Sequence, residues 1–433
     1  MSDVIVGIVG LAVVLLLFLT GIELAFAMAL VGFLGFAYIV SLPAALNVLA
    51  KDVFDVFASY GFTVIPLFVL MGQVAFNAGI AKRLYNTSYK FLGHIPGGLA
   101  MATVGGAAVF GAITGSSPAT AATFASVAVP EMDRYGYQKK LSTGIVSAVG
   151  TLGSLIPPSV TLIIYGIITE QSIGKLFLAA IIPGILISLF LFSIVYGWCK
   201  INPSLGPKGE RSTWKERIIS LKEVIWVLLI FVIVIGGLTW GFFTPTEAGS
   251  IGTFSVLLFS AIKRDINFKG FIRSVAEALR TACMVLMLIA GSTILGHFLV
   301  VTKIPMIAAD WIMGLPLPAY LTMLIILLIY EIGGSFIDDL AFMVLATPIF
   351  YPAIIKLGYD PIWFGIILHI FVMIGCLIPP VAINVFVVKN ITKVPFGVIY
   401  KGVLPFLVGF IACAALLFLF PQLALFLPSV LMK

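Results

Sequence analysis

Residues 153–158 read Gly-Ser-Leu-Ile-Pro-Pro inside an otherwise apolar segment, and residues 375–380 read Gly-Cys-Leu-Ile-Pro-Pro inside another, 222 positions later (375 minus 153). Two adjacent prolines remove two backbone N–H donors and disfavour helical geometry in the residue before them, so a helix entering either stretch must unwind there. In hydrocarbon, the freed backbone groups are tolerated only where protein or a polar cavity surrounds them. The repeated break therefore predicts a binding site near the middle of a membrane.

The composition around these breaks is that of a polytopic membrane protein. Hydrophobic residues make up 61% of the 433 residues and charged residues only 10%, and the mean hydropathy is +1.19. These values lie well outside the range of soluble domains. The four cysteines are scattered through apolar runs without metal-ligand spacing, which indicates small buried side chains, and no metal site beyond an alkali cation is expected.

Ordinary apolar spans account for most of the chain. We expect them at about residues 4–20, 24–40 (after a tight turn at 21–23), 60–79, 176–198, 223–242, 247–262, 281–300 and 402–427. Residues 41–59 are expected to form a loop, because they contain Lys51, Asp52 and Asp55. The basic segment 263–280 is expected to separate the spans at 247–262 and 281–300. Residues 82–94 and 302–314 are amphipathic and are expected to lie along the membrane interface.

Four segments depart from simple spans. Residues 97–130 are too long for one crossing and carry Gly-Ser-Ser-Pro at their centre, a turn followed by a helix start, which predicts a re-entrant hairpin. A second hairpin is expected at 316–355, with Asp338 and Asp339 at its turn. The two Pro-Pro segments predict broken spans at 141–168 and 361–388.

The two halves of the chain share an ordered set of Gly and Pro positions. Pro130, Gly136, Tyr137 and Pro183 recur as Pro352, Gly358, Tyr359 and Pro405 at the offset of 222, and Gly72 and Gly115-Ser116 recur as Gly291 and Gly334-Ser335 at 219. Five expected spans separate the hairpins, so the hairpins should enter the membrane from opposite faces. We therefore predict an all-α membrane protein with an inverted-topology repeat, two re-entrant hairpins and two broken transmembrane helices.

The positive charges give an orientation. Tracing the chain through these spans places 20 of the 25 Lys and Arg residues on one side, which the positive-inside rule makes cytoplasmic. Both termini are then expected outside. The expected parts are scaffold helices (1–80 and 223–300), a cytoplasmic linker (199–222), and two transport parts that contain a hairpin and a broken span (81–198 and 301–433).

The predicted hairpin tips and helix breaks offer hard oxygen ligands. Hairpin tips and helix breaks expose carbonyl oxygens and N–H groups, with hydroxyls from residues such as Ser116 and Ser335 among them. Such groups suit a small alkali cation, and helix N-termini suit an anion. An ionisable residue at bilayer depth costs about 2.5 to 3.5 kcal/mol, so Asp338 and Asp339 predict a cation partner or a water-filled cavity.

The motifs together resemble the large membrane subunit of tripartite ATP-independent periplasmic (TRAP) transporters. The resemblance rests on the hairpin sequence of residues 115–120, Pro130-Glu-Met132, the two Leu-Ile-Pro-Pro motifs, Thr244-Pro-Thr-Glu247 and Asn384. It covers nearly the whole chain. It implies an elevator-type, ion-transporter-like protein of the bacterial inner membrane that imports an organic acid with sodium and is not an enzyme.

The resemblance also implies site residues and partners. One sodium site would use Ser116, Ser117, Gly150 and Gly153, and the other Gly334, Ser335, Asp338 and Gly375, with Cys376 in the place of Ser154. Substrate would contact Thr120, Pro157, Pro158, Pro380 and Asn384. The implied partners are a small four-span membrane subunit, expected as a separate chain, and a periplasmic solute-binding protein.

Several alternatives stay open from the sequence. Ser116, Ser117, Asp338 and Asp339 could serve as helix caps, and Asn384 could be structural. Glu247 is expected in a first helical turn, Glu331 could face the cavity, and His369 should find a partner in the bundle. A carboxylate carrier that needs no binding protein would keep every feature derived from the residues. Neighbouring carboxylates on one helix point apart, which disfavours an aspartyl protease, and no ATP-binding motif occurs.

Overall fold

The computed structural model describes residues 2–314 and 316–432. Within these residues the chain forms α-helices, one short 3-10 helix and no strand. Among the described residues, seven helices are long and apolar enough to cross a membrane, or eight if a helix pair bent by 43° (Lys139–Leu155 and Val160–Ile168) is counted as one span. The all-helical membrane fold expected from composition is confirmed.

A hairpin, a broken helix and a long helix follow one another in each half. The first set is α6 (Gly98–Thr114), α7 (Ser117–Arg134), α8 (Lys139–Gly150), α9 (Leu152–Leu155), α10 (Val160–Ile168) and α11 (Ile173–Ile201). The second is α16 (Ala319–Phe336), α17 (Asp339–Lys356), α18 (Pro361–Gly375), α19 (Ile383–Thr392) and α20 (Phe396–Leu419). Both helical hairpins and both Pro-Pro breaks therefore lie where the sequence predicted them. We call these helices the hairpin group.

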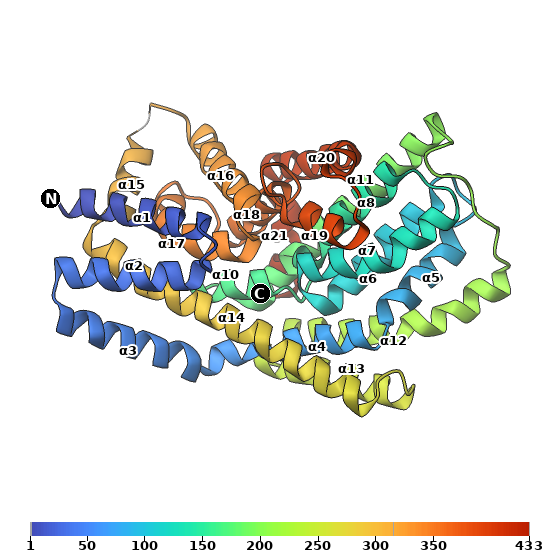
Figure 1. The fold of residues 1–433 in the computed structure, drawn as a ribbon, viewed down its shortest axis with the longest axis horizontal. Helices are drawn as coiled ribbons and strands as arrows, with labels where there is room; N and C mark the ends of the chain where they lie inside the picture. The colour runs from blue at the N-terminus through green and yellow to red at the C-terminus, as the bar shows by residue number, and fades with distance from the viewer. Residues whose placement is uncertain (1, 315, 433) are drawn as a thin grey trace.

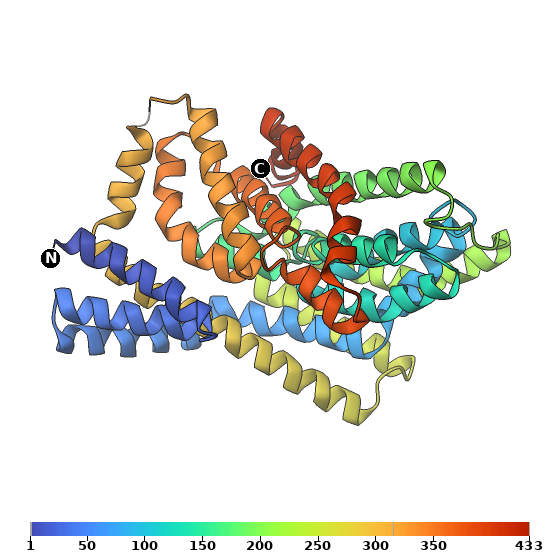
Figure 2. The same ribbon diagram turned by 45° about the horizontal axis from the view of Figure 1, so that its top comes forward.

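The remaining long helices form a second group, which we call the outer helices. They are α1 (Asp3–Leu19), α2 (Leu24–Ile39), α3 (Leu42–Ala58), the 3-10 turn Tyr60–Thr63, α4 (Val64–Asn77), α12 (Trp214–Thr239), α13 (Pro245–Ile262) and α14 (Phe268–Val301). In Figures 1 and 2, α14 runs beside α2 and beside the line formed by α3 and α4, and it contacts all three. Two short helices, α5 (Ile80–Leu92) and α15 (Ile304–Met313), connect the outer helices to the hairpins in sequence.

The prediction of a loop at residues 41–59 is wrong, because α3 occupies that stretch. The Ser41 hydroxyl caps the helix by accepting a hydrogen bond from the Ala44 N–H at 3.3 Å, and a proline stands in the first turn. Ala45, Asp52 and Val56 are buried on one face, while Lys51 and Asp55 are exposed. The charges that suggested a loop thus belong mainly to the exposed face of an amphipathic helix.

Three other boundaries also differ from expectation. The basic segment 263–280 is no separator, since α14 begins at Phe268 and continues for 34 residues from its Asn267 cap. The linker is shorter than 199–222, because α11 extends to Ile201 and α12 begins at Trp214 behind a Thr213–Glu216 capping box. The last span ends at Leu419, and Pro421 begins a new direction into α21 (Gln422–Leu431).

Small residues bring the outer helices into close contact. A side chain at Gly32 of α2 would lie 2.6 Å from the Leu295 N atom, and one at Gly291 of α14 would overlap the Ala25 carbonyl oxygen. Both neighbours are backbone atoms, which cannot move aside as a flexible side chain can. The α2–α14 crossing therefore depends on glycine, as is common where membrane helices pack.

We expect Gly291→Ala to destabilise the protein by about 1 to 3 kcal/mol, because the new methyl group forces α14 away from α2. The measurement is the melting temperature of the purified protein in detergent. Gly296→Ala on the same helix is the matched control, since no atom lies within 4 Å of the added methyl group. Equal melting temperatures for the two variants would contradict the close contact.

Candidate functional site

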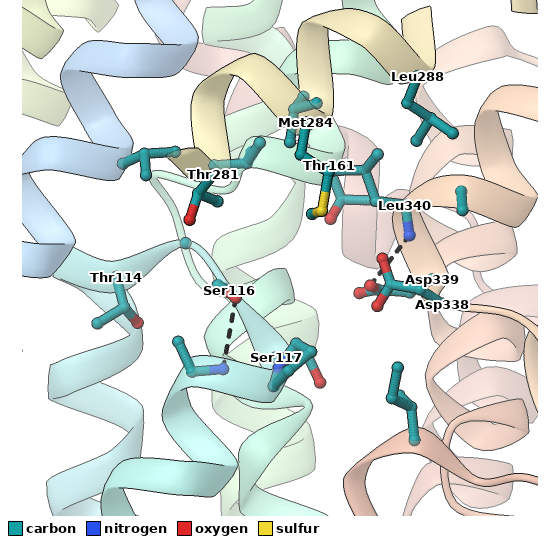
Figure 3. Close-up of a pocket in the computed structure, with 18 of the residues that line it drawn as sticks. Thr114, Ser116, Ser117, Thr161, Thr281, Met284, Leu288, Asp338, Asp339 and Leu340 are labelled. Atoms are coloured by element: carbon teal, nitrogen blue, oxygen red, sulfur yellow. Dashed lines mark hydrogen bonds between the residues drawn. The ribbon is translucent and has the colours of Figure 1, made fainter. Parts of the chain in front are cut away.

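A cavity of about 770 Å³ separates the outer helices from the hairpin tips. One wall comes from α1, α2, α4 and α14, and the other comes from both hairpin tips and both helix breaks (Figure 3). The polar residues of the two walls are Glu23, Gln73, Glu277 and Thr281 on the outer helices, and Thr114, Ser116, Ser117, Thr123, Thr161, Asp338 and Asp339 on the hairpin side. The size is that of a site for a small organic ligand.

The first hairpin tip is closed by local sequence. Gly115 ends α6 with a φ of +62°, which glycine tolerates, and the Ser116 side chain then accepts a hydrogen bond from the Ala119 N–H at the start of α7. The Thr120 hydroxyl donates to the Ser116 carbonyl at 2.9 Å and lies 3.0 Å from the Thr114 hydroxyl. Ser116 is thus a helix cap and also lines the cavity.

Each hairpin tip satisfies backbone donors at one of the Pro-Pro breaks. The Val160 N–H, after the first break, donates to the Gly115 carbonyl at 3.3 Å. The Val381 and Ala382 N–H groups, at the second break, donate to the Ser335 carbonyl at 3.0 and 3.2 Å. Both Pro-Pro peptide bonds are cis. The sequence therefore supplies each break with a partner from the preceding hairpin.

Glycines let the broken helices approach the tips. A side chain at Gly153 would overlap Thr120 Oγ1 and lie 2.5 Å from the Ser116 carbonyl oxygen. A side chain at Gly375 would overlap the Glu331 carbonyl oxygen and lie 2.8 Å from the Ser335 N atom. The two breaks therefore pack on their hairpins in the same way.

Asn384 joins the two halves of the chain. Its amide donates to Ser117 Oγ at 2.9 Å and to the Ser147 carbonyl at 3.3 Å, and Ser117 Oγ lies 3.1 Å from Asn384 Oδ1. His369, also fully buried, lies 3.1 Å from the Ser154 hydroxyl through Nε2. The expected bundle partner of His369 is therefore present.

The second hairpin tip is acidic. Asp338 is the N-cap residue of α17 but makes no capping hydrogen bond through its side chain. Asp339 is only 4% exposed, and its Oδ1 accepts a hydrogen bond from the Leu340 N–H at 3.0 Å. Within the described residues, Asp339 Oδ2 is buried and has no partner. Capping alone therefore does not account for these two carboxylates.

The N-termini of four helices line this cavity. Ser117, Val160, Asp339 and Ile383 begin α7, α10, α17 and α19, and all four residues line it. Helix N-termini carry partial positive charge and unsatisfied N–H groups, so they favour an anion. No Lys or Arg from residues 2–314 and 316–432 lines the cavity. An anionic ligand would be met by helix dipoles, hydroxyls and any bound cations.

The predicted cation residues fall into two clusters. Ser116 and Ser117 line the cavity, with Gly153 against Ser116 and Gly150 beside Asn384. Asp338 lines it at the other tip, where Gly334, Ser335 and Gly375 are packed together. The structure therefore brings each predicted set to one hairpin tip.

The predicted substrate residues lie behind the wall. Thr120, Pro157, Pro158 and Asn384 are buried, Pro380 is exposed, and none of the five is among the residues that line the cavity in the described chain. Glu331 does not line it either. Glu247 forms a capping box with Thr244 at the start of α13, as expected of a first-turn acid.

Sequence reasoning did not single out the outer wall or Thr161. Gln73, Glu277 and Thr281 come from segments that looked like ordinary spans or a basic connector. Glu277 is held by the Asn77 amide at 3.1 Å and by Arg273 Nε at 2.8 Å. Only Gln73 could have been recognised from the sequence, because it is a polar side chain within an apolar span.

Two solved membrane transporters have a fold similar to that of this chain. The YdaH transporter of Alcanivorax borkumensis superposes with a TM-score of 0.61 at 13% identity, covering 88% of this chain and 89% of that one. The efflux pump MtrF of Neisseria gonorrhoeae gives 0.58 at 16% identity, covering 88% and 84%. At this identity the likeness concerns the fold alone.

The family model of the tripartite ATP-independent periplasmic transporter, DctM component, matches residues 11–423. The chain therefore belongs to this family and is a large permease component of a TRAP transporter. The C4-dicarboxylate permease DctM of Pseudomonas aeruginosa is 34% identical over 388 residues, 89% of this chain and 90% of that protein. The sialic acid permease SiaM of Vibrio cholerae is 33% identical over 89% and 90%. The isethionate permease DctMQ of Oleidesulfovibrio alaskensis is 34% identical over 95% of this chain and 64% of its own length.

We expect Gly375→Ala to lower the transport rate by about tenfold or more, because the methyl group separates the α18 break from the second hairpin tip. Transport is measured in cells, with the amount of protein in the membrane determined in parallel. Gly397→Ala is the control, since nothing lies within 4 Å of its added methyl group. Unchanged transport in the Gly375→Ala variant would argue against a functional role for this contact.

Proposed function

We propose that this chain imports a small organic acid across the bacterial inner membrane, coupled to the entry of sodium. The proposal rests mainly on the cavity, which is lined by two hairpin tips and by the N-termini of four helices. No Lys or Arg is among its described lining residues. The names of the relatives, which include C4-dicarboxylate, sialic acid and isethionate permeases, support an organic anion as substrate.

Sodium fits the residues at the tips. Sodium is a hard cation that prefers oxygen ligands, and the tips offer the Ser116 carbonyl next to Gly153, several hydroxyls, and the Asp338 carboxylate. Bound sodium would offset the negative charge of the tip and add positive charge where the acid binds.

We infer an elevator mechanism in which the hairpin group moves against the outer helices. The cavity lies between these two groups, so substrate bound there touches both. Helices α5 and α15 connect the groups in sequence and could act as the arms of the moving part. Helix α5 packs on α6 of the hairpin group and on α12 of the outer helices, and α15 packs on α17.

Two partners complete the proposal. Family membership supports a small membrane subunit and a periplasmic binding protein that delivers the acid. The distribution of Lys and Arg supports a cytoplasmic location for the basic connections and a periplasmic location for both termini. Selectivity would then be shared between the binding protein and the cavity.

The first test is uptake of labelled acids into proteoliposomes that contain this chain and its small subunit. We expect uptake only with an inward sodium gradient and a cognate binding protein, because binding energy from both is needed to close the site. A potassium gradient of equal size is the control. Uptake that needs the gradient but no binding protein would instead favour an independent carboxylate carrier.

The second test is a disulfide between the moving and fixed groups. The Ser292 hydroxyl of α14 donates to the Val344 carbonyl of α17 at 3.0 Å, so these positions are close in this structure. We expect the double variant Ser292→Cys, Val344→Cys to lose transport on oxidation and to regain it on reduction. The exposed Cys283 is replaced by Ser in this background, and each single variant is a control. Full transport by the crosslinked protein would rule out the proposed movement.

A further inference from the structure

We propose that the cavity selects an acid with a single carboxylate and with hydrogen-bond donors, hydroxyl or ammonium, at its other end, and that Asp339 recognises this donor end. The inference rests on the proposed function, because it names the class of acid that the same cavity takes. Its basis is a chemical difference between two tips that are otherwise built alike.

The two hairpin tips begin their second helices with different side chains. Helix α7 starts with Ser116 as N-cap and Ser117 as first residue, whereas α17 starts with Asp338 and Asp339 at the same two positions. Figure 3 shows the serine pair and the aspartate pair on opposite sides of the open space. The Ser116 hydroxyl accepts a hydrogen bond from the Ala119 N–H and keeps its own hydrogen to donate to an anion, while ionised carboxylates can only accept hydrogen bonds. The cavity therefore has one pole for a carboxylate and one for donors.

Asp339 has an unused acceptor at its pole. Its side chain is 4% exposed and Oδ1 is occupied by the Leu340 N–H, but Oδ2 is buried and has no partner in the described part of the chain. Leaving a carboxylate oxygen buried and unpaired is unfavourable. No described Lys or Arg lines the cavity, so a donor group of a bound ligand can fill this place.

Sodium does not remove this preference. In the proposed function, sodium at the second tip is bound by Asp338 and offsets one of the two charges. The outer wall adds the carboxylates of Glu23 and Glu277, of which Glu277 is already paired with Arg273. A second carboxylate on the substrate would therefore face like charge from Asp339 and Glu23. Hydroxyl or ammonium groups in the same place would be attracted.

The test compares four six-carbon acids that differ away from the shared carboxylate. Hexanoate, 6-aminohexanoate and adipate carry a methyl, an ammonium and a second carboxylate group at the far end, and gluconate carries hydroxyls. Binding is measured by ligand-dependent thermal stability of the chain with its small subunit in nanodiscs, in sodium or potassium chloride of equal concentration. No binding protein is present, so the cavity alone is tested.

In sodium, we expect gluconate and 6-aminohexanoate to bind about tenfold or more tightly than hexanoate and adipate, as a hydrogen bond to a charged group allows. Asp339→Asn should reduce this preference and strengthen adipate binding relative to the donor-bearing acids. Asp339→Ser, which copies Ser117 of the other tip, is the second variant. Asp338→Asn should instead shift the sodium dependence of binding for all four acids alike. Asp55→Asn is the control for folding, because Asp55 is exposed.

The possible failures are distinct. Adipate binding as tightly as gluconate and 6-aminohexanoate to the unmodified protein would overturn the inference and leave the proposed function standing. Asp339 variants that change only the sodium dependence, with the order of the acids unchanged, would make Asp339 a sodium ligand and also overturn it. If none of the four acids binds in sodium, the inference fails, and the proteoliposome uptake test decides the proposed function separately.

Discussion

The structure depends on how two interrupted helices satisfy the hydrogen-bonding groups of their backbone within a membrane. The N–H groups freed at the Pro-Pro breaks, those of Val160, Val381 and Ala382, donate to carbonyl oxygens at Gly115 and Ser335. In hydrocarbon no water could replace these bonds, so each break requires its hairpin. The same requirement explains Gly153 and Gly375, where any side chain would push the break away from the tip. Because a break creates a new helix N-terminus, the solution to a backbone problem also brings partial positive charge to the cavity.

Similar backbones carry different chemistry in the two halves. Each tip contacts its break through the same kind of carbonyl, but one tip offers serine hydroxyls and the other carboxylates. Buried side chains then join the halves, as Asn384 does with Ser117 and His369 with Ser154. These hydrogen bonds join the two halves of the hairpin group, as the proposed elevator movement would require.

The outer helices provide a rigid surface against which that unit lies. Glycine contacts hold α14 to α2, and the length of α14 carries it past α3 and α4 as well. The wall that this group presents to the cavity is polar at only a few positions, with Glu277 already held by Asn77 and Arg273. In the proposed mechanism, the cavity between the outer helices and the hairpin tips is where coupling between cation and substrate would be set.

The sequence by itself determined the hairpins, the breaks and the family, because prolines and a Gly-Ser-Ser-Pro turn act on the backbone locally, wherever the segment lies. It also identified Asp338 and the serine pair, since polar residues in an apolar chain need a reason to be there. It misjudged residues 41–59 and 263–280, because most of their charges lie on exposed positions of helices whose other faces pack on distant segments. Only the tertiary structure decided which residues face the cavity from the outer helices and the first break: Gln73, Thr161 and Glu277 come from three helices far apart in sequence, and side-chain direction there is fixed by packing between those helices.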